Sequence, residues 1–371
     1  MKNQPGQQAP RTPSALKVNK GIPQPSSLNE QAAGNFRLRR KPELSAETYV
    51  RGILDGDRVL LSRAITLIES SLKSHYELAQ RIIEYCIPYS GNSLRIGITG
   101  VPGVGKSTFI EAFGKHLIEQ DHRIAVLAID PSSGISRGSI LGDKTRMETL
   151  SVDENAFIRP SPSAGSLGGV ARKTRETIIL CEAAGFDIVL VETVGVGQSE
   201  TAVHSMVDFF LLLMLAGAGD ELQGIKRGII EMCDGMAINK ADGDNLNKAG
   251  AARIQYENAL HLFPPAASGW KPQVLTCSAI QKTGIPEIWE MILEFKTKMQ
   301  AKGTFQSRRM SQEKHRMHNT ITETLKERFY SDTIIEKMIK EAEDKLAKQK
   351  ITPYQAARQL LDSYFNDNKL R

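Results

Sequence analysis

Residues 94–108 read LRIGITGVPGVGKST, an apolar run that leads into a glycine-rich loop. The loop, Gly100 to Ser107, matches the complete pattern GxxxxGK[ST], in which glycines let successive backbone N–H groups converge on phosphate oxygens. The apolar run predicts a strand over Leu94–Thr99. A helix is expected over Lys106–Glu119, so its dipole adds positive potential at the loop. This order of strand, loop and helix favours a phosphate-binding loop over an ordinary glycine-rich turn.

Further apolar runs predict the sheet that contains this first strand. Segments long enough for helices separate most of them, and alternating strands and helices are typical of a parallel sheet covered on both faces. The predicted fold class is therefore α/β, a P-loop NTPase with a mostly parallel sheet flanked by helices. The other expected strands are Ile124–Ile129, Ile188–Val191, Phe209–Met214, Met236–Asn239 and Val274–Thr276, and the other expected helices are Val170–Ala184, Asn245–His261 and Ile285–Met299.

Helical segments and a polar arm flank this core. Ser45 is expected to cap a helical region whose apolar positions, Val59 among them, roughly follow the helical period. Pro88 and Gly91 end it, and Pro353 opens the last helix of the chain, where its missing N–H costs nothing. The expected divisions are a disordered arm over 1–42, an N-terminal helical extension over 43–92, a nucleotide-binding domain over 93–302 and a C-terminal helical extension over 303–371.

Composition limits the class of protein. The chain has 371 residues, of which 40% are hydrophobic and 24% are charged, as in soluble globular proteins. Its longest apolar run, Phe209–Ala216, is too short to cross a bilayer, which takes about 20 residues. Residues 1–8 contain no apolar core of a signal peptide. We therefore expect a soluble, cytoplasmic protein that does not act at a membrane.

Cysteine, histidine and charge exclude other classes. The four cysteines and seven histidines are dispersed, without the spacing of a disulfide framework or a zinc site. The net charge of +6 is concentrated in residues 37–41 and 308–316. Neither run interleaves the aromatic residues that stack on bases, so nucleic-acid binding is not expected. A solvated arm, or a contact with an acidic surface of a partner, is the preferred interpretation of both runs.

The phosphate loop implies a set of catalytic and metal-binding candidates. Lys106 is expected to reach the β and γ phosphates and the Ser107 hydroxyl to ligate Mg²⁺. Glu192 ends a strand where most such enzymes place an aspartate near the metal, so Lys106 and Glu192 are the catalytic candidates. Asp130 and Asp143 are further metal candidates, with a turn or capping role as the alternative for each. The nucleotide contacts expected here are Gly100, Gly103, Val104, Gly105, Lys106, Ser107 and Thr108.

The segment Asn239-Lys240-Ala241-Asp242 predicts the base. It fits the NKxD element and follows a strand-like run. The carboxylate of Asp242 can accept from the ring N–H and the exocyclic amino group of guanine, whereas adenine offers no such pair of donors. We expect Lys240 to lie along the base and Asn239 to tie this loop to the phosphate loop. The run Ser278, Ala279 and Ile280 resembles the SA loop and is expected to complete guanine recognition.

Two glycine-containing segments are candidate switches. Gly195 follows Glu192, where a glycine senses the γ-phosphate, and Gln198 is displaced from the position of the glutamine that orients water in many GTPases. We therefore expect slow intrinsic hydrolysis that a partner accelerates. The loop over 217–226 has glycines that permit large backbone changes, with a surface loop without a signalling role as the alternative. Its candidate switch residues are Asp220, Glu221 and Lys226.

Four long strings together resemble one family. Residues 130–133 (DPSS), 138–147 (GSILGDKTRM), 192–200 (ETVGVGQSE) and 217–226 (GAGDELQGIK) look like the methylmalonyl-CoA mutase-associated GTPases called MeaB or ArgK. These strings are far more specific than the phosphate loop. The match runs from about residue 45 to the C-terminus and is densest between 94 and 280.

The resemblance implies a particular biological role. It implies a GTPase of the metallochaperone superclass that dimerises through its C-terminal helices. It also implies a chaperone that uses GTP to gate cobalamin loading and to protect an adenosylcobalamin-dependent acyl-CoA mutase. By position, the family's phosphate and Mg²⁺ roles fall on Lys106, Ser107, Asp130, Asp143 and Glu192, with GTP or GDP and Mg²⁺ as cofactors.

Two alternatives come from the same resemblance. A nickel-inserting metallochaperone of the hydrogenase or urease type needs clustered thiolate or imidazole ligands, and the sequence does not have them. The family's older label, a kinase of a lysine/arginine/ornithine transport system, implies phosphorylation of an exported protein. We find no kinase catalytic motif to support it.

Overall fold

The computed structural model describes residues 44–70, 72–130, 147–162, 167–193, 199–217, 227–263 and 268–367. The chain divides into two units, 1–44 and 45–371, of which the second holds nearly all of the described residues. The arm expected to be disordered, 1–42, lies outside them. The divisions of the remaining chain at residues 92 and 302 stay predictions.

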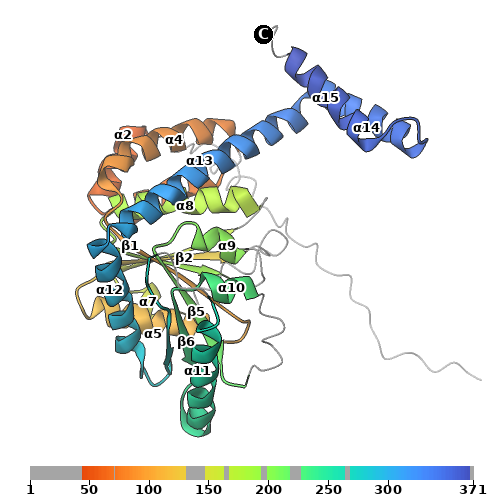
Figure 1. Ribbon diagram of the computed structural model, residues 1–371. Coiled ribbons are helices and arrows are strands. Elements are labelled where there is room, and N and C mark those ends of the chain that lie inside the picture. The colour runs from red at the N-terminus through yellow and green to blue at the C-terminus, as the bar shows by residue number, and fades with distance from the viewer. Residues whose placement is uncertain are drawn as a thin grey trace, which may run out of the picture. The chain divides into compact units, whose positions relative to one another are not determined.

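Seven parallel strands form the sheet at the centre of the second unit (Figure 1). Their order is β3-β2-β4-β1-β5-β6-β7, so the chain reverses direction of winding next to β1. This confirms the predicted fold class. The bounds are β1 Leu94–Gly100, β2 Ile124–Asp130, β3 Ala156–Pro162, β4 Ile188–Thr193, β5 Phe209–Leu215, β6 Gly235–Asn239 and β7 Gln273–Thr276.

Strand β3 is the one strand that the sequence pattern did not predict. It pairs with β2 along its whole length, with Ile124 opposite Ala156 and Asp130 opposite Pro162. Its sequence, AFIRPSP, holds two prolines and an arginine, which strand propensity disfavours. Proline is tolerated here because β3 lies at the edge of the sheet, where one side of the strand has no ladder to complete.

Helices cover both faces of the sheet, which explains why its central strands are apolar throughout. Every residue of β4 is buried. On one face, Phe109 and Phe113 of α5 pack with Trp289 of α12. On the other, α8 and α9 contact the strands, and α2, α3 and α4 contact α8. The bounds are α2 Ala46–Leu54, α3 Arg58–Glu69, α4 Lys73–Cys86, α5 Lys106–Ile118, α7 Glu148–Ser151, α8 Leu167–Ala183, α9 Ser199–His204, α10 Arg227–Met232, α11 Leu246–Leu260 and α12 Ile285–Ala301.

The N-terminal helices begin and end at residues that the sequence indicated. The Ser45 side chain accepts a hydrogen bond from the backbone N–H of Thr48 and caps α2. A short 3₁₀ turn, η1 Ile87–Tyr89, contains Pro88 and ends the region. The expected apolar period is wrong at Val59, which is 66% exposed. It is the second residue of α3, directly after the first residue that follows the N-cap Asp57, in a turn of the helix that is still exposed to solvent.

Three further helices follow α12, and the first of them is fastened to the sheet. They are α13 Thr304–Ser331, α14 Thr333–Ala347 and α15 Pro353–Asp367, the last beginning at Pro353 as predicted. The expectation that the basic run 308–316 is solvated or meets a partner is wrong for Arg308 and Arg309. Arg308 binds Asp234 (Nη1 to Oδ1 2.9 Å), and Arg309 binds Asp208 (Nε to Oδ1 2.7 Å), both in the same chain.

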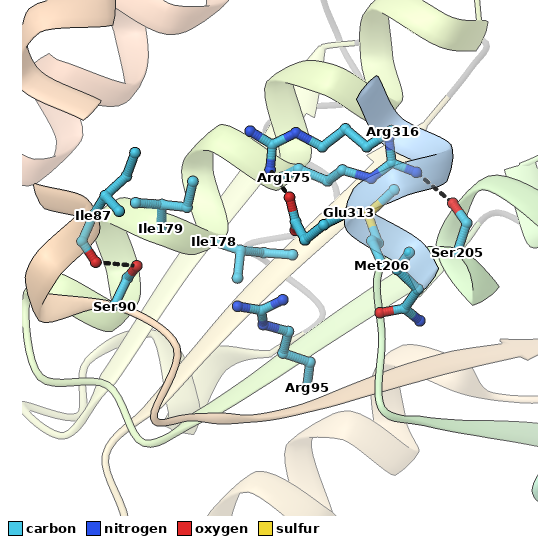
Figure 2. A pocket seen from close by; sticks show the side chains of 11 residues that line it. Ile87, Ser90, Arg95, Arg175, Ile178, Ile179, Ser205, Met206, Glu313 and Arg316 are labelled. Carbon is cyan, nitrogen blue, oxygen red and sulfur yellow. Dashed lines mark hydrogen bonds and ion pairs between the residues drawn. The ribbon is translucent and has the colours of Figure 1, made fainter. Parts of the chain in front are cut away.

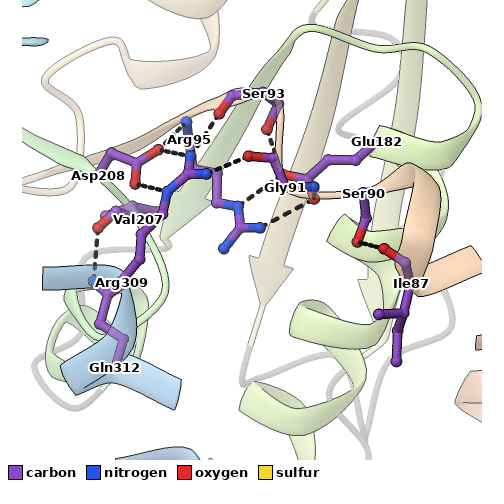
Figure 3. A network of polar contacts seen from close by, with 10 residues as sticks. All are labelled: Ile87, Ser90, Gly91, Ser93, Arg95, Glu182, Val207, Asp208, Arg309 and Gln312. Atoms are coloured by element: carbon purple, nitrogen blue, oxygen red, sulfur yellow. Dashed lines mark hydrogen bonds and ion pairs between the residues drawn. The ribbon is translucent and has the colours of Figure 1, made fainter. Parts of the chain in front are cut away.

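Arg309 is the centre of the polar network that Figure 3 shows at the start of β1. Besides Asp208, it donates to the backbone carbonyl oxygens of Gly91 and Ser93. Asp208 in turn accepts from the backbone N–H of Arg95 at 2.8 Å. Arg309 and Asp208 are 12% and 2% exposed in their side chains, so this ion pair is shielded from water.

Replacing Arg309 by alanine should lower the free energy of unfolding by about 3–5 kcal/mol, because it leaves the Asp208 carboxylate buried without its cation. Urea denaturation measures this change. The matched control is Lys340→Ala on α14, whose ion pair with Glu336 is exposed on both sides. Its removal should change stability by no more than about 0.5 kcal/mol. Equal effects of the two substitutions would show that the Arg309 network does not hold α13.

Candidate functional site

The predicted nucleotide-binding residues lie at the carboxyl ends of the strands. β1 ends at Gly100, β4 at Thr193 and β6 at Asn239, and parallel strands place these ends at one edge of the sheet. The strand order changes direction between β4, β1 and β5. Ligands of open α/β sheets bind at such a point, outside the carboxyl ends of the strands.

The loop after β1 has the backbone conformation that its glycines allow. Gly103 and Gly105 have φ angles of 78° and 89°, which favour glycine. Gly105 is also the N-cap of α5, and a Cβ atom there would lie 3.2 Å from the side-chain nitrogen of Asn239. Space and conformation thus both select glycine. The Val104 side chain is fully buried in the core, so only its backbone can face a ligand.

Lys106 is held over this loop. Its ammonium group donates to the carbonyl oxygens of Gly100 (2.9 Å) and Val101 (3.3 Å). Burial lowers the pKa of Lys106 from its ordinary value, while the nearby carboxylates of Glu192 and Glu200 act in the opposite direction. A cation in such surroundings gains from an added anion, which is the chemistry of phosphate binding.

Ser107 and Glu192 come together from two elements. The Ser107 hydroxyl, in the first turn of α5, donates to Oε1 of Glu192 at 3.3 Å. Glu192 is 8% exposed and stands opposite Ile98 of β1. These oxygens fit Mg²⁺, which binds oxygen ligands and uses few from the protein. The pairing depends on the registry of β1 with β4, which the motif spacing alone does not define.

The NKxD segment contacts the phosphate loop at two places. The Asn239 amide donates to the Val104 carbonyl oxygen at 2.8 Å, and the Lys240 ammonium donates to the Gly103 carbonyl oxygen at 2.9 Å. Lys240 itself has a φ of 60°, in the left-handed region. The side chain of Asn239, on a residue 2% exposed, also accepts from the backbone N–H of Ala279 at 3.3 Å. Asn239 therefore joins three loops.

Asp242 is oriented by Ser278. The Ser278 hydroxyl donates to Oδ2 of Asp242 and accepts from the backbone N–H of Gln281 at 3.1 Å. Ser278 is fully buried, whereas Asp242 is half-buried and stays reachable by a ligand. This hydrogen bond orients the carboxylate, whose two oxygens keep lone pairs for further donors. Ile280, the third residue of that loop, is 78% exposed.

Sequence reasoning missed two supporting contacts. The Asn245 amide donates to the Lys240 carbonyl oxygen at 2.7 Å and braces the left-handed turn. The hydroxyls of Thr193 and Thr99 form a buried hydrogen bond of 2.8 Å between the ends of β4 and β1. Asn245 stands in the polar run Gly243–Asn245, a local turn signal that could have indicated it. The threonine pair has no local signal, because it depends on strand pairing.

Several predicted residues lie outside the described part of the chain. Among the metal candidates, these are Asp143 and the side chain of Asp130, although Asp130 is the last residue of β2. Thr108 is on the exposed side of α5. The roles of all these residues stay predictions. The switch candidates outside the described part are Gly195, Gln198, Asp220, Glu221 and Lys226.

Two kinds of site are absent from the described ranges. Within them, no group of three or more His, Cys, Asp or Glu side chains is arranged to hold a metal ion. No helix of the same ranges is long and apolar enough to cross a membrane. The four cysteines are all free and buried.

The fold and the motifs at this edge define a P-loop nucleotide-binding protein. The chain belongs, more specifically, to the family of methylmalonyl-CoA mutase-associated GTPases called MeaB, whose family model matches residues 61–334. It is therefore a GTPase and binds guanine nucleotide. The family assignment confirms the resemblance that the four long strings indicated.

Individual relatives agree with this assignment. GTPase ArgK of Escherichia coli is 52% identical over 270 residues, which cover 73% of this chain and 82% of that protein. The mouse protein named methylmalonic aciduria type A homolog, mitochondrial, is 45% identical and the alignment covers 88% of this chain and 81% of that protein. A crystal structure named LAO/AO transport system kinase has a TM-score of 0.70 and 39% identity, covering 86% of this chain and 97% of that one.

Replacing Asp242 by asparagine should shift the nucleotide preference from guanine toward xanthine. The carboxylate accepts two hydrogen bonds, whereas the amide offers one donor and one acceptor, which suits the 2-oxo group of xanthine. The free energy of GTP binding should weaken by roughly 1–3 kcal/mol, which lowers the affinity about 5- to 160-fold. Calorimetric titration of both nucleotides measures the shift, and Asp244→Asn, two residues away, is the matched control. A variant that still prefers GTP as strongly as the parent would exclude Asp242 as the base-reading group.

Replacing Lys106 by alanine should abolish turnover and weaken GTP binding. The substitution removes the ammonium group that neutralises charge on the β and γ phosphates. Phosphate release and GTP titration measure the two effects. Lys248→Ala, which removes an exposed lysine of α11, should leave both unchanged. Turnover by the Lys106 variant at the parental rate would contradict the assignment.

Proposed function

We propose that the chain is a GTP-hydrolysing switch that acts as a chaperone for an adenosylcobalamin-dependent acyl-CoA mutase of the methylmalonyl-CoA mutase type. In this role it gates cobalamin loading and protects the mutase. The names of the family and of the mouse relative support the choice of client. What supports a switch is that Glu192 and the residues that contact α13 lie close together in the sequence.

One connection carries the switch proposal. The Ser107 hydroxyl contacts Glu192 at the carboxyl ends of the strands, and α9 begins at Ser199, six residues after Thr193. The end of α9 contacts α13: Nη2 of Arg308 lies 3.2 Å from Nε2 of His204, and the Gln312 amide donates to the carbonyl oxygen of Val207 at 2.8 Å. We propose that a change at the phosphate end of β4 reaches α13 along the chain to α9 and then through these contacts.

The chemistry proposed for hydrolysis uses groups already placed at this edge. The N–H groups of the loop and the Lys106 ammonium would hold the β and γ phosphates and stabilise their developing charge. Ser107 and Glu192, with Asp130 and Asp143 as further candidates, would hold Mg²⁺. When bound, Mg²⁺ neutralises charge on the phosphates. Asp242, positioned by Ser278, would select guanine.

We propose that hydrolysis is slow until a partner orders the switches. The residue after Gly195 is Val196, so the glutamine that orients water in many GTPases is not at its usual place. A partner that arranges the segment after Glu192, or supplies an arginine, would complete the site. Such completion is worth about 10³–10⁵ in rate in other GTPases.

We also propose that the chain forms a homodimer through its C-terminal helices. Helix α13 carries large apolar side chains that are half or more exposed, at intervals of seven and four residues along one side. Exposed apolar rows of this kind mark contact surfaces. They are Met310, Met317, Ile321 and Leu325.

The experiment that tests the proposal measures GTP turnover and complex formation with a cobalamin-dependent acyl-CoA mutase. We expect the mutase to raise the turnover number by about tenfold or more, and to bind differently in the GTP and GDP states. Lys106→Ala should form the complex without the rise in turnover. If the mutase alters neither nucleotide affinity nor turnover, the chaperone role is wrong, while the GTPase assignment stands.

A further inference from the structure

A cavity of about 180 Å³ lies far from the nucleotide edge, between α8, the end of α9 and α13 (Figure 2). Three arginines line it: Arg175 of α8, Arg316 of α13 and Arg95 of β1. Arg95 and Gly100 are five residues apart along β1, which corresponds to about 17 Å. The cavity is therefore distinct from the phosphate loop, which lies at the other end of the same strand.

The side chains of Arg175 and Arg316 lie side by side, and their positive charges have little compensation. Figure 2 shows their side chains running past each other in opposite directions, one from α8 and one from α13. Within the described ranges, Arg175 forms no ion pair with a carboxylate, and its guanidinium donates to the Ser205 hydroxyl. Arg316 pairs with Glu313 at 3.3 Å, but the Glu313 side chain is 55% exposed. Such an exposed pair stabilises a charge only weakly.

The third arginine, Arg95, does not add to this uncompensated positive charge. Arg95 donates to both carboxylate oxygens of Glu182, at 2.8 and 3.0 Å, and that pair is almost fully buried. Its charge is therefore already matched. Arg316 is paired with Glu313, whereas Glu323 acts on Arg175 without forming an ion pair with it, so the least compensated positive charge at the cavity is that of Arg175.

The surroundings of Arg175 make its uncompensated positive charge energetically costly. Burial, followed by repulsion from Arg316, lowers the pKa of the Arg175 guanidinium from its ordinary value, while Glu313 and Glu323 act in the opposite direction. Two like charges held together in partly buried surroundings repel, and an anion placed between them removes the repulsion. The cavity between α8 and α13 thus has both the volume and the positive charge to bind an anion.

The hydrogen-bond donors that line the cavity define the chemistry of that anion. Ser205 donates its hydroxyl hydrogen to the Ala202 carbonyl oxygen, and the Gln312 amide donates to His204 and Val207. The guanidinium groups of Arg175 and Arg316 remain, each a planar fork that suits an oxyanion. The cavity is several times larger than the roughly 30 Å³ of one water molecule. A tetrahedral oxyanion can present a different edge to each fork.

We propose that this cavity binds an oxyanion of the phosphate class between Arg175 and Arg316. Such an anion bridges α8 and α13 and fastens the C-terminal helices to the sheet domain. The site is independent of the nucleotide site and of the mutase role. The anion is either free phosphate or the phosphate group of a small ester.

Calorimetric titration with inorganic phosphate tests the proposal, with the full chain saturated by GDP and Mg²⁺ so that the phosphate loop is occupied. Ionic strength is kept constant with chloride. We expect saturable binding with one site per chain, weakened at least tenfold by Arg175→Gln and by Arg316→Gln. Lys314→Gln removes an exposed positive charge from the same helix and should bind as the parent does.

Parallel titrations with glycerol phosphate and malonate define the ligand. Tighter binding of glycerol phosphate than of phosphate assigns the site to an ester, and the reverse assigns it to the free ion. Absence of saturable phosphate binding, or equal binding by the parent and both arginine variants, overturns the proposal. Tighter binding of malonate than of either phosphate compound also overturns it. If Arg175→Gln does not fold, Arg175→Lys keeps the charge without the fork and should bind phosphate more weakly than the parent does.

Discussion

The side-chain amide of Asn239 is the interaction on which the nucleotide edge depends. It donates to the phosphate loop at Val104 and accepts from the backbone N–H of Ala279, while the residue itself is almost completely buried. Removing the amide would leave two buried backbone groups unpaired, at a cost of about 1–3 kcal/mol each. The same amide limits Gly105 to a residue without a side chain. One hydrogen-bonded unit therefore joins the phosphate-loop motif to the NKxD segment and to the loop that contains Ala279.

Much of this edge could be predicted because its motifs are local. A phosphate loop or an NKxD segment contains its own glycines, cation or carboxylate, and each directly follows a strand. Contacts between elements could not be predicted in this way. The hydrogen bond between Thr99 and Thr193 joins residues 94 positions apart and requires the registry of β1 with β4. Likewise, six strands were predicted from apolar runs, but β3 was missed, because its prolines and arginine give no such run.

The C-terminal region shows a second limit of sequence reasoning. A run of arginines carries no sign of whether it faces water or a carboxylate of the same chain. Arg308 and Arg309 find their partners 74 and 101 positions away, at Asp234 and Asp208. Those aspartates directly precede β6 and β5, at the amino ends of the strands. The phosphate loop and the NKxD segment thus lie at the carboxyl ends of the strands, and the long helix α13 is held at their amino ends. The strands are the rigid connections between the two.

The composition of β3 has a consequence for how copies of this chain can meet. An edge strand with free N–H and C=O groups is a template on which another chain can add a strand and begin to aggregate. Pro160 and Pro162 offer no N–H, and the Arg58 guanidinium occupies the carbonyl oxygen of Ala156 at 2.6 Å. The side chain of Arg159, which directly precedes Pro160, forms an ion pair with Glu69 of α3. This margin of the sheet is therefore a poor template for intermolecular β-pairing.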